Sequence, residues 1–360
     1  MNTDSFRRHA RACVDIAIHA VYRSHPGELF DRLLRVARPR SVALVQALAS
    51  LARYEPIRDP ESWAGATGHP LGVTASLASH LYGQYPVPRF LASVWFGADD
   101  ARHRWYLEHA RGRPFRRLPL PIAMSRQMEH LFLRSPDPMS ASHALRRAEI
   151  LGLGGSPALV DAILQTRLGD HFDAPERWRA ALLWFASRDV PLAQVAPIVD
   201  FLEANPTVDP TGRTVARVLH LMHEWHVALV RSRWAITRWA ASRWTGFAIG
   251  VKGGEWTFVE LLDSHALRQE GREMRHCVAS YARSCVRGDS SIWSLRFRRR
   301  DQDEARPVLT VEVYPRTGSV AQIRGKANAL PADAPLDLVL AWAIRNGLTA
   351  KQWLPRLVRA

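Results

Sequence analysis

The chain has 360 residues, of which 47% are hydrophobic and 23% charged, a composition that excludes a disordered protein and a length that allows two domains. The formal net charge is +15, and only three of the 49 basic residues are lysines, so guanidinium groups carry almost all of the positive charge. Guanidinium groups make bidentate contacts with phosphates, which favours an anionic partner such as DNA or RNA. The alternative is that these arginines are spread over solvated helix faces.

The cysteines and the N-terminal residues indicate in which cellular compartment the protein is located. Three cysteines are too few for a disulfide framework and indicate a reducing environment. Near the N-terminus a short apolar run is soon followed by charges, without the long apolar segment and cleavage site of a signal peptide. No stretch reaches the roughly 18 apolar residues of a membrane-spanning helix. We therefore expect a cytoplasmic protein without membrane insertion.

The pattern up to about residue 245 is helical. Apolar residues recur at three and four positions over 40–54, 142–153 and 214–244, and clusters of Pro, Gly and Asp separate these stretches. The sequence predicts an all-helical domain over residues 1–245.

Two short motifs in this region suggest ligands, and both fail on spacing or context. GLGGSP (152–157) lacks the preceding strand and the third glycine of a dinucleotide-binding loop, and Ser156 before Pro157 is instead typical of a helix start. HEWH (223–226) places its histidines three apart, whereas a zinc-binding helix needs them four apart. The sequence therefore predicts neither a cofactor nor a metal site.

The composition changes at TGFAIGVKGGEW (245–256), where glycines end the helical pattern and aromatic and β-branched residues begin to alternate. We place a domain boundary there and expect a small α+β domain over 246–360. Its predicted elements are a helical stretch over 263–288, strands at 291–297, 308–314 and 320–328, and a helix at 335–348. The fold class is α+β, mainly α, with a three-stranded antiparallel sheet.

The predicted strands have one apolar and one polar face. The polar face presents Ser294, Arg296, Thr310, Glu312, Gln322, Arg324 and Lys326, with Asn328 following. One interpretation is a cradle for an anionic ligand such as phosphate, in which Arg296, Arg324 and Lys326 contact the anion and Glu312 positions them or acts as a base. Gln322 and Asn328 complete this candidate ligand-binding set. The alternative is a solvated face with cross-strand ion pairs.

A longer pattern in this domain identifies a family resemblance. EGREMRHCVASYARSCVRGDSSIWSLR, followed by LTVEV and QIRGKAN, resembles the PcfJ-like family over about residues 260–330. Its members carry EG-x-x-M-x-HCV-x-x-Y-x-x-x-C-x-x-G-x-S-x-I-x-S-[LM]-R and then Q-x-RG-x-x-N. The namesake is encoded among plasmid conjugation genes, so the resemblance implies a nucleic-acid-associated accessory factor linked to mobile DNA, with other mobilisation proteins as partners.

The segment MRHCVASYARSC (274–285) holds two of the cysteines. On a single helix, Cys277 and Cys285 lie about 12 Å apart along the axis, too far for a disulfide or for one zinc ion. Core packing is then expected for both, with Met274, Val278 and Tyr281 on the same stripe. If a helix instead starts near His276, Cys277 lies in its first turn, where the helix dipole lowers a thiol pKa.

Two other function classes remain open. An enzyme acting on a phosphorylated or nucleotide substrate would use His276, Glu312 and Lys326 as acid–base and anion-binding groups, provided that the three converge in one pocket. A protein-interaction scaffold would present an aromatic surface on the N-terminal helices. Its candidate residues are Trp95, Trp105, Trp178 and Trp184, although core packing is the usual role of tryptophan.

Overall fold

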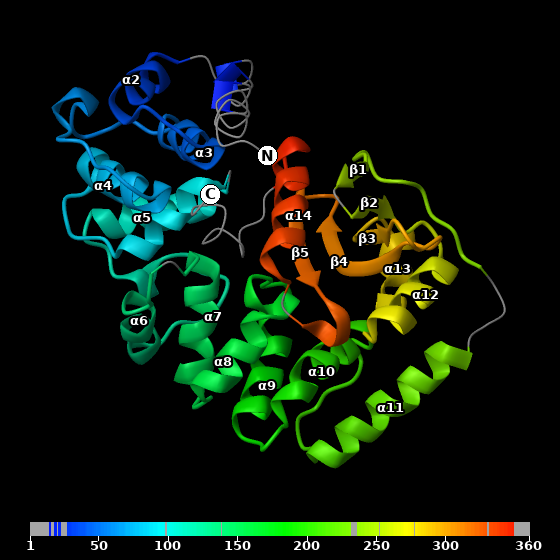
Figure 1. The fold of residues 1–360 in the computed structure, drawn as a ribbon. Helices are drawn as coiled ribbons and strands as arrows, with labels where there is room; N and C mark the ends of the chain where they lie inside the picture. The colour runs from blue at the N-terminus through cyan, green and yellow to red at the C-terminus, as the bar shows by residue number, and fades with distance from the viewer. Residues whose placement is uncertain are drawn as a thin grey trace. The chain divides into compact units, whose positions relative to one another are not determined.

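The computed structural model of the chain describes residues 14–15, 18–19, 21–22, 27–97, 99–137, 139–231, 236–251, 253–276, 278–329 and 331–348. These residues form two compact units, one ending at Gly152 and the other beginning at Leu153 (Figure 1). The domain boundary that we placed at 245/246 rests on a change in composition along the sequence, and it stays a prediction. No helix of the described ranges is both long and apolar enough to cross a bilayer.

The first unit is helical in its described part. Its α-helices are α2 (Glu28–Ala37), α3 (Val42–Leu51), α4 (Pro70–Tyr82), α5 (Asp100–Ala110), α6 (Arg126–Leu133) and α7 (Ala141–Gly152). Short 3₁₀ segments connect them, namely η1 (Pro60–Ser62), η2 (Arg89–Phe96) and η3 (Phe115–Arg117). Trp95 of η2 lies at the centre of the core, stacked on Tyr82 and His103. The helical patterns predicted over 40–54 and 142–153 are confirmed.

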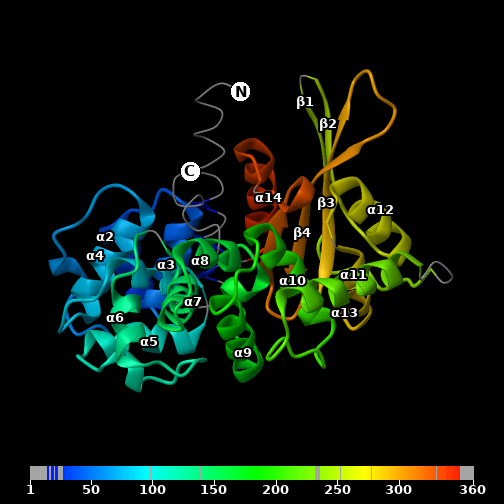
Figure 2. The same ribbon diagram turned by 90° about the horizontal axis from the view of Figure 1, so that it is seen from below.

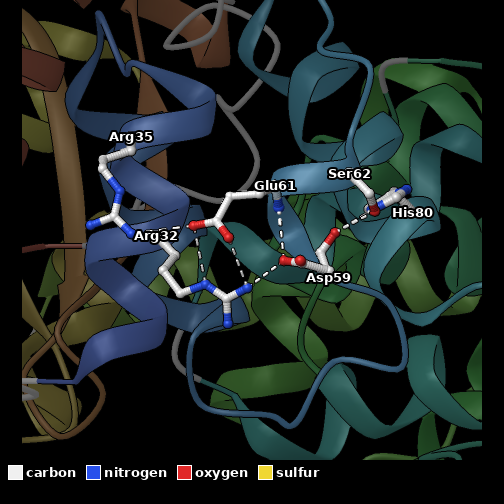
Figure 3. A network of polar contacts seen from close by, with 6 residues as sticks. All are labelled: Arg32, Arg35, Asp59, Glu61, Ser62 and His80. Atoms are coloured by element: carbon white, nitrogen blue, oxygen red, sulfur yellow. Dashed lines mark hydrogen bonds and ion pairs between the residues drawn. The ribbon is translucent and has the colours of Figure 1, made fainter.

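An exposed polar network joins α2 to η1 in this unit (Figure 3). Arg32 and Arg35 pair with Glu61, and Arg32 also pairs with Asp59. Beyond the ion pairs, Ser62 Oγ lies 3.2 Å from His80 Nε2, which resembles a nucleophile and its base. Both groups also contact the Asp59 carbonyl oxygen, at 2.7 and 2.9 Å. Because a carbonyl only accepts hydrogen bonds, His80 Nε2 carries a proton and has no lone pair for the serine.

The second unit starts with four α-helices and one 3₁₀ helix. They are α8 (Pro157–Leu164), η4 (Arg167–Gly169), α9 (Pro175–Ala186), α10 (Leu192–Ala204) and α11 (Val215–Arg231). Ser156 caps α8 by accepting a hydrogen bond from the Leu159 amide, so the helix start predicted from GLGGSP is confirmed. The helical pattern predicted over 214–244 is too long, because α11 ends at Arg231 and Arg238 forms a bridge with Asp263.

The sheet of the second unit has five antiparallel strands in the order β1-β2-β3-β4-β5, so the three-stranded prediction is wrong. The strands are β1 (Phe247–Val251), β2 (Gly254–Glu260), β3 (Ser291–Arg299), β4 (Arg306–Tyr314) and β5 (Ser319–Arg324). The two missed strands form a hairpin in which Val251 pairs with Gly254. Alternating residues on both sides of Gly253–Gly254 were the sequence signal for this hairpin. The predicted α+β class, mainly helical, is confirmed.

Helices cover both faces of the sheet (Figures 1 and 2). After the 3₁₀ segment η6 (Lys326–Asn328), α14 (Asp333–Arg345) packs on the apolar face, where Trp342 contacts Phe258 and Trp293. Between β2 and β3 the chain forms α12 (Ser264–Met274), η5 (Val278–Tyr281) and α13 (Ala282–Val286), which lie on the other face. The mainly polar face of the sheet is therefore interior to the unit.

The segment 263–288 is not one helix. α12 ends at Met274, and Arg275 adopts a left-handed conformation with φ of 56° before the 3₁₀ helix η5 begins. The distance between Cys277 and Cys285 derived from a single helix therefore does not apply, and Cys277 itself lies outside the described residues. Cys285 is buried among Leu261, Leu267 and Ile292, as expected of a core cysteine, and burial raises the pKa of its thiol to about 12.

Candidate functional site

The site lies where α12 and η5 cover the polar face of the sheet. Ser294, Thr310 and Arg324 are neighbours across β3, β4 and β5, and Ile292, Glu312 and Gln322 form the adjacent row. Strand alternation places these six side chains on one face, as predicted for all of them except Ile292. The alternative of a solvated face is wrong at four of these positions, because Ser294, Thr310, Glu312 and Arg324 are all buried. The physical reason is the helical cover that begins at Ser264.

Glu270 of α12 anchors the helix to the sheet. Its carboxylate accepts hydrogen bonds from Ser294 Oγ at 2.9 Å and Thr310 Oγ1 at 2.8 Å, and Arg296 Nη2 lies 3.3 Å away. Burial raises the pKa of this carboxyl, although the hydrogen bonds and the Arg296 charge oppose the shift. Arg296 is thus engaged with Glu270, and its role as a contact for an external anion stays a prediction.

His276 follows the turn at the end of α12 and points to the sheet. Its Nε2 lies 2.9 Å from Thr310 Oγ1, whose hydroxyl donates to Glu270, so the imidazole N–H donates to the threonine oxygen. Burial lowers the pKa of His276 to about 4, and the nearby positive charge of Arg324 contributes, so the ring is neutral at pH 7. A Cβ on Gly271 would lie 2.9 Å from the His276 carbonyl oxygen, which explains a glycine at this point of close approach.

Glu312 lies on β4 with its two carboxylate oxygens in different situations. Oε1 accepts a hydrogen bond from Ser290 at 2.7 Å and lies 3.9 Å from Arg167 Nη2. Oε2 is buried and has no hydrogen-bond partner among the described residues. Burial raises the pKa of Glu312, against the opposing effects of Arg167 and Ser290. The Glu312 carboxyl therefore binds its proton more tightly than the carboxyl of an exposed glutamate.

Arg167 of η4 is a buried residue that sequence reasoning missed. It donates from Nε to Tyr314 at 2.9 Å, and its guanidinium lies over the Tyr281 and Tyr314 rings. Burial opposes its charge, but Glu312 and other nearby acidic groups raise its pKa well above the ordinary value. Nothing in the sequence near Arg167 indicates this role, because its partners are far away along the chain.

Arg324, at the end of β5, contrasts with Arg167. Arg324 is buried, with 8% of the residue exposed, and its guanidinium makes no hydrogen bond or ion pair with the side chain or backbone of another described residue. Burial lowers its pKa, while the charge of Asp200 acts in the opposite direction through space. An arginine side chain stays protonated in proteins, so this is a buried cation without a contacting counter-ion in the described part of the chain.

A small pocket brings these groups together. It has a volume of about 40 Å³, and the polar side chains that line it are Asp200, His276, Tyr281, Thr310, Glu312, Gln322 and Arg324. Since one water needs about 10–15 Å³, the pocket has room for about three waters. Two of the three predicted acid–base and anion-binding residues, His276 and Glu312, share it. Lys326 is exposed and does not line it, and the Asn328 side chain lies outside the described part.

Other predicted sites receive less support from the geometry. Trp95, Trp105, Trp178 and Trp184 are all buried, so an exposed aromatic interface made from them is wrong. Within the described ranges, no cluster of three or more His, Cys, Asp or Glu side chains is arranged to hold a metal ion.

The comparisons with known proteins concern the same part of the chain. Residues 201–336 match the model of a family described as PcfJ-like protein, which confirms the predicted resemblance over that segment. The matched range includes Glu270, His276, Glu312 and Arg324, whereas Arg167 lies outside it. Searches of the curated proteins and of the solved structures gave no match.

Proposed function

We propose that this PcfJ-like chain binds a phosphate group of a nucleotide or nucleic acid in the pocket beneath His276 and η5 and performs acid–base chemistry on that ligand. The observation that carries the proposal is Arg324, a buried guanidinium that lines the pocket and has no contacting counter-ion in the described residues. A buried charge is costly unless it is paired, so an arrangement of this kind favours an anionic ligand as the missing partner.

The chemistry of the lining favours phosphate. A guanidinium donates two parallel hydrogen bonds to phosphate or carboxylate oxygens, and Thr310 and Gln322 add short polar groups beside it. A volume of about 40 Å³ admits an anionic group of phosphate size, but not a whole nucleotide. The rest of the ligand must then lie outside the pocket.

Two groups in the lining support proton transfer. Glu312 has an unbonded carboxylate oxygen and a raised pKa, and a general acid or base is most effective when its pKa is near the working pH. His276 is neutral and is oriented through Thr310 by Glu270. In this proposal Glu312 donates a proton to the bound ligand or accepts one from it. Arg324 neutralises the charge of the phosphate, and His276 is a neutral group that lines the same pocket.

The wider cellular role rests on other grounds. Association with DNA or RNA is supported by the net charge of +15, carried mostly by arginine. A link to plasmid or mobile-DNA functions, and to other mobilisation proteins as partners, is supported only by the PcfJ-like resemblance over 201–336. The polar face of the sheet is covered by α12 and η5, so the proposed contact with a nucleic acid does not run across an open sheet face.

Calorimetric titration with inorganic phosphate tests the binding step. Wild type should bind phosphate, and Arg324→Gln should lose binding by about 10–100-fold, as expected when a charge-assisted hydrogen-bonding partner worth roughly 1.5–3 kcal/mol is removed. Lys326→Gln is the matched control, because it removes the same charge from an exposed residue two positions away. Equal affinity of Arg324→Gln and wild type would exclude the pocket as the phosphate site.

A second measurement tests the chemistry. Nucleotides and short oligonucleotides are incubated with the protein and the products identified by mass spectrometry. Glu312→Gln should retain phosphate binding and lose turnover, because glutamine cannot exchange a proton. If no product forms with wild type, the pocket is a binding site and the acid–base part of the proposal fails.

A further inference from the structure

A larger cavity adjoins the small pocket within the second unit. It has a volume of about 770 Å³ and lies between α10 and α11 on one side and α12, η5 and α13 on the other. Asp200 and Tyr281 line both cavities, so the two lie side by side at these residues. A ligand whose phosphate enters the pocket would therefore continue into this groove.

Arginines distributed along the groove give it its charge. Arg268 of α12, Arg283 of α13 and Arg287, which directly follows α13, line its wall. Arg283 is exposed, and its guanidinium makes no hydrogen bond or ion pair with a described residue. Arg287 is also exposed, and among the described residues its guanidinium pairs with Asp289 alone. Arg283 and Arg287 are one helical turn apart, about 6 Å along the axis, and so they share one side of the helix.

The acidic groups of the groove lie near its junction with the pocket and are engaged. Glu203 lies 3.5 Å from Arg167, which also contacts Tyr314, and Asp200 accepts from the Tyr281 hydroxyl at 3.5 Å. The wall formed by α13 therefore presents cations, while the carboxylates near the junction are partnered. Separate cations along a groove fit a polymer with repeating phosphates better than a single anionic group.

We propose that the groove holds a short stretch of single-stranded nucleic acid, with Arg283 and Arg287 on its backbone phosphates and an adjacent phosphate in the Arg324 pocket. The inference rests on the proposed function, because it takes the pocket as a phosphate site. A volume of about 770 Å³ accommodates a few nucleotides of one strand but not a duplex. The half-buried Trp225 ring in the lining offers a surface on which a base stacks.

Fluorescence anisotropy with labelled 12-nucleotide single-stranded DNA, the same RNA and the corresponding duplex tests this inference across a salt series. Arg283→Gln/Arg287→Gln should lower the salt slope by about 1.4, since each phosphate contact on a single strand contributes about 0.7. Extrapolated from 1 M salt, this corresponds to about 25-fold weaker binding at 0.1 M. The matched control is Arg299→Gln/Arg300→Gln, which removes the same charge from exposed positions near the end of β3, outside the groove.

Binding of inorganic phosphate tests the proposed pocket function separately from the groove inference. The groove variant should bind phosphate like wild type, whereas Arg324→Gln should not. If phosphate binding depends on Arg324 but the two double variants bind oligonucleotide equally, the groove inference is overturned and the pocket stands. If oligonucleotide binding needs the groove arginines but phosphate binding ignores Arg324, the proposed pocket function fails. Duplex binding as tight as single-strand binding, or no oligonucleotide binding at all, overturns the single-strand inference.

Discussion

Arg146 in the first unit and Arg324 in the second are both buried, yet their surroundings differ. Arg146 lies on α7 with 2% exposure and pairs with Glu149 three residues later, which is 1% exposed. Arg324 lines a pocket and has no contacting carboxylate among the described residues. The charge of Arg146 is neutralised within its own helix, with no ligand needed. The charge of Arg324 is neutralised by direct contact only when an anionic ligand binds. The comparison separates a buried charge that serves the fold from one that costs stability until a ligand binds.

The largest effect should come from breaking the complete pair. Arg146→Gln removes the buried ion pair with Glu149, and removal of one member of a buried pair costs about 3–5 kcal/mol. Urea unfolding of wild type and variant measures the loss. The double variant Arg146→Met/Glu149→Leu should recover most of it, because no isolated charge remains. A loss below about 1 kcal/mol in the single variant would remove the basis of the comparison.

The next effect is a pH dependence that arises from His276. Above about pH 7.5 the ring is neutral in both states, so it contributes no pH dependence there. Between about 6.5 and 4 the unfolded chain binds the proton and the folded chain does not, so stability falls as the pH falls. The change from pH 7 to pH 4.5 amounts to about 2–3 kcal/mol at 1.36 kcal/mol per pKa unit. Below about pH 4 both states are protonated and the dependence ends.

The His276 contribution is isolated by comparison with His276→Gln. The raised pKa values of Glu270 and Glu312 act in the opposite sense, because their contribution is present at low pH and is lost as the pH rises. Subtracting the pH profile of His276→Gln from that of wild type removes these shared terms. Parallel profiles for the two proteins would show that the His276 ring is not held neutral.

The smallest effect should have the opposite sign. Arg324→Gln removes a buried charge that lacks a counter-ion, so the ligand-free variant should be more stable than wild type by about 1 kcal/mol. Phosphate at 100 times its Kd should stabilise wild type by about 2.7 kcal/mol and leave the variant unchanged. Thermal unfolding with and without phosphate measures both terms. Destabilisation as large as that of Arg146→Gln would place Arg324 with the structural arginines.

Local patterns in the sequence predicted much of the second unit. The alternation in β3, β4 and β5 placed Ser294, Thr310 and Arg324 on one face, because side-chain direction in a strand follows from neighbouring residues alone. The capping of α8 by Ser156 and the core position of Cys285 were also predicted. The β1–β2 hairpin had a sequence signal in Gly253–Gly254, but the strands were not identified from it.

Only the tertiary structure decided what that polar face does. Residue types in β3 to β5 do not show that α12 covers them, because an alternating strand has the same pattern whether water or a polar helix face lies over it. The cover depends on Glu270, which reaches Thr310 across 40 residues, and on the left-handed turn at Arg275 that directs His276 to the sheet. Arg167 joins Glu312 across a still larger separation. The sequence by itself determined which groups share a face, and long-range packing determined which are partnered, which are buried and which remain open to a ligand.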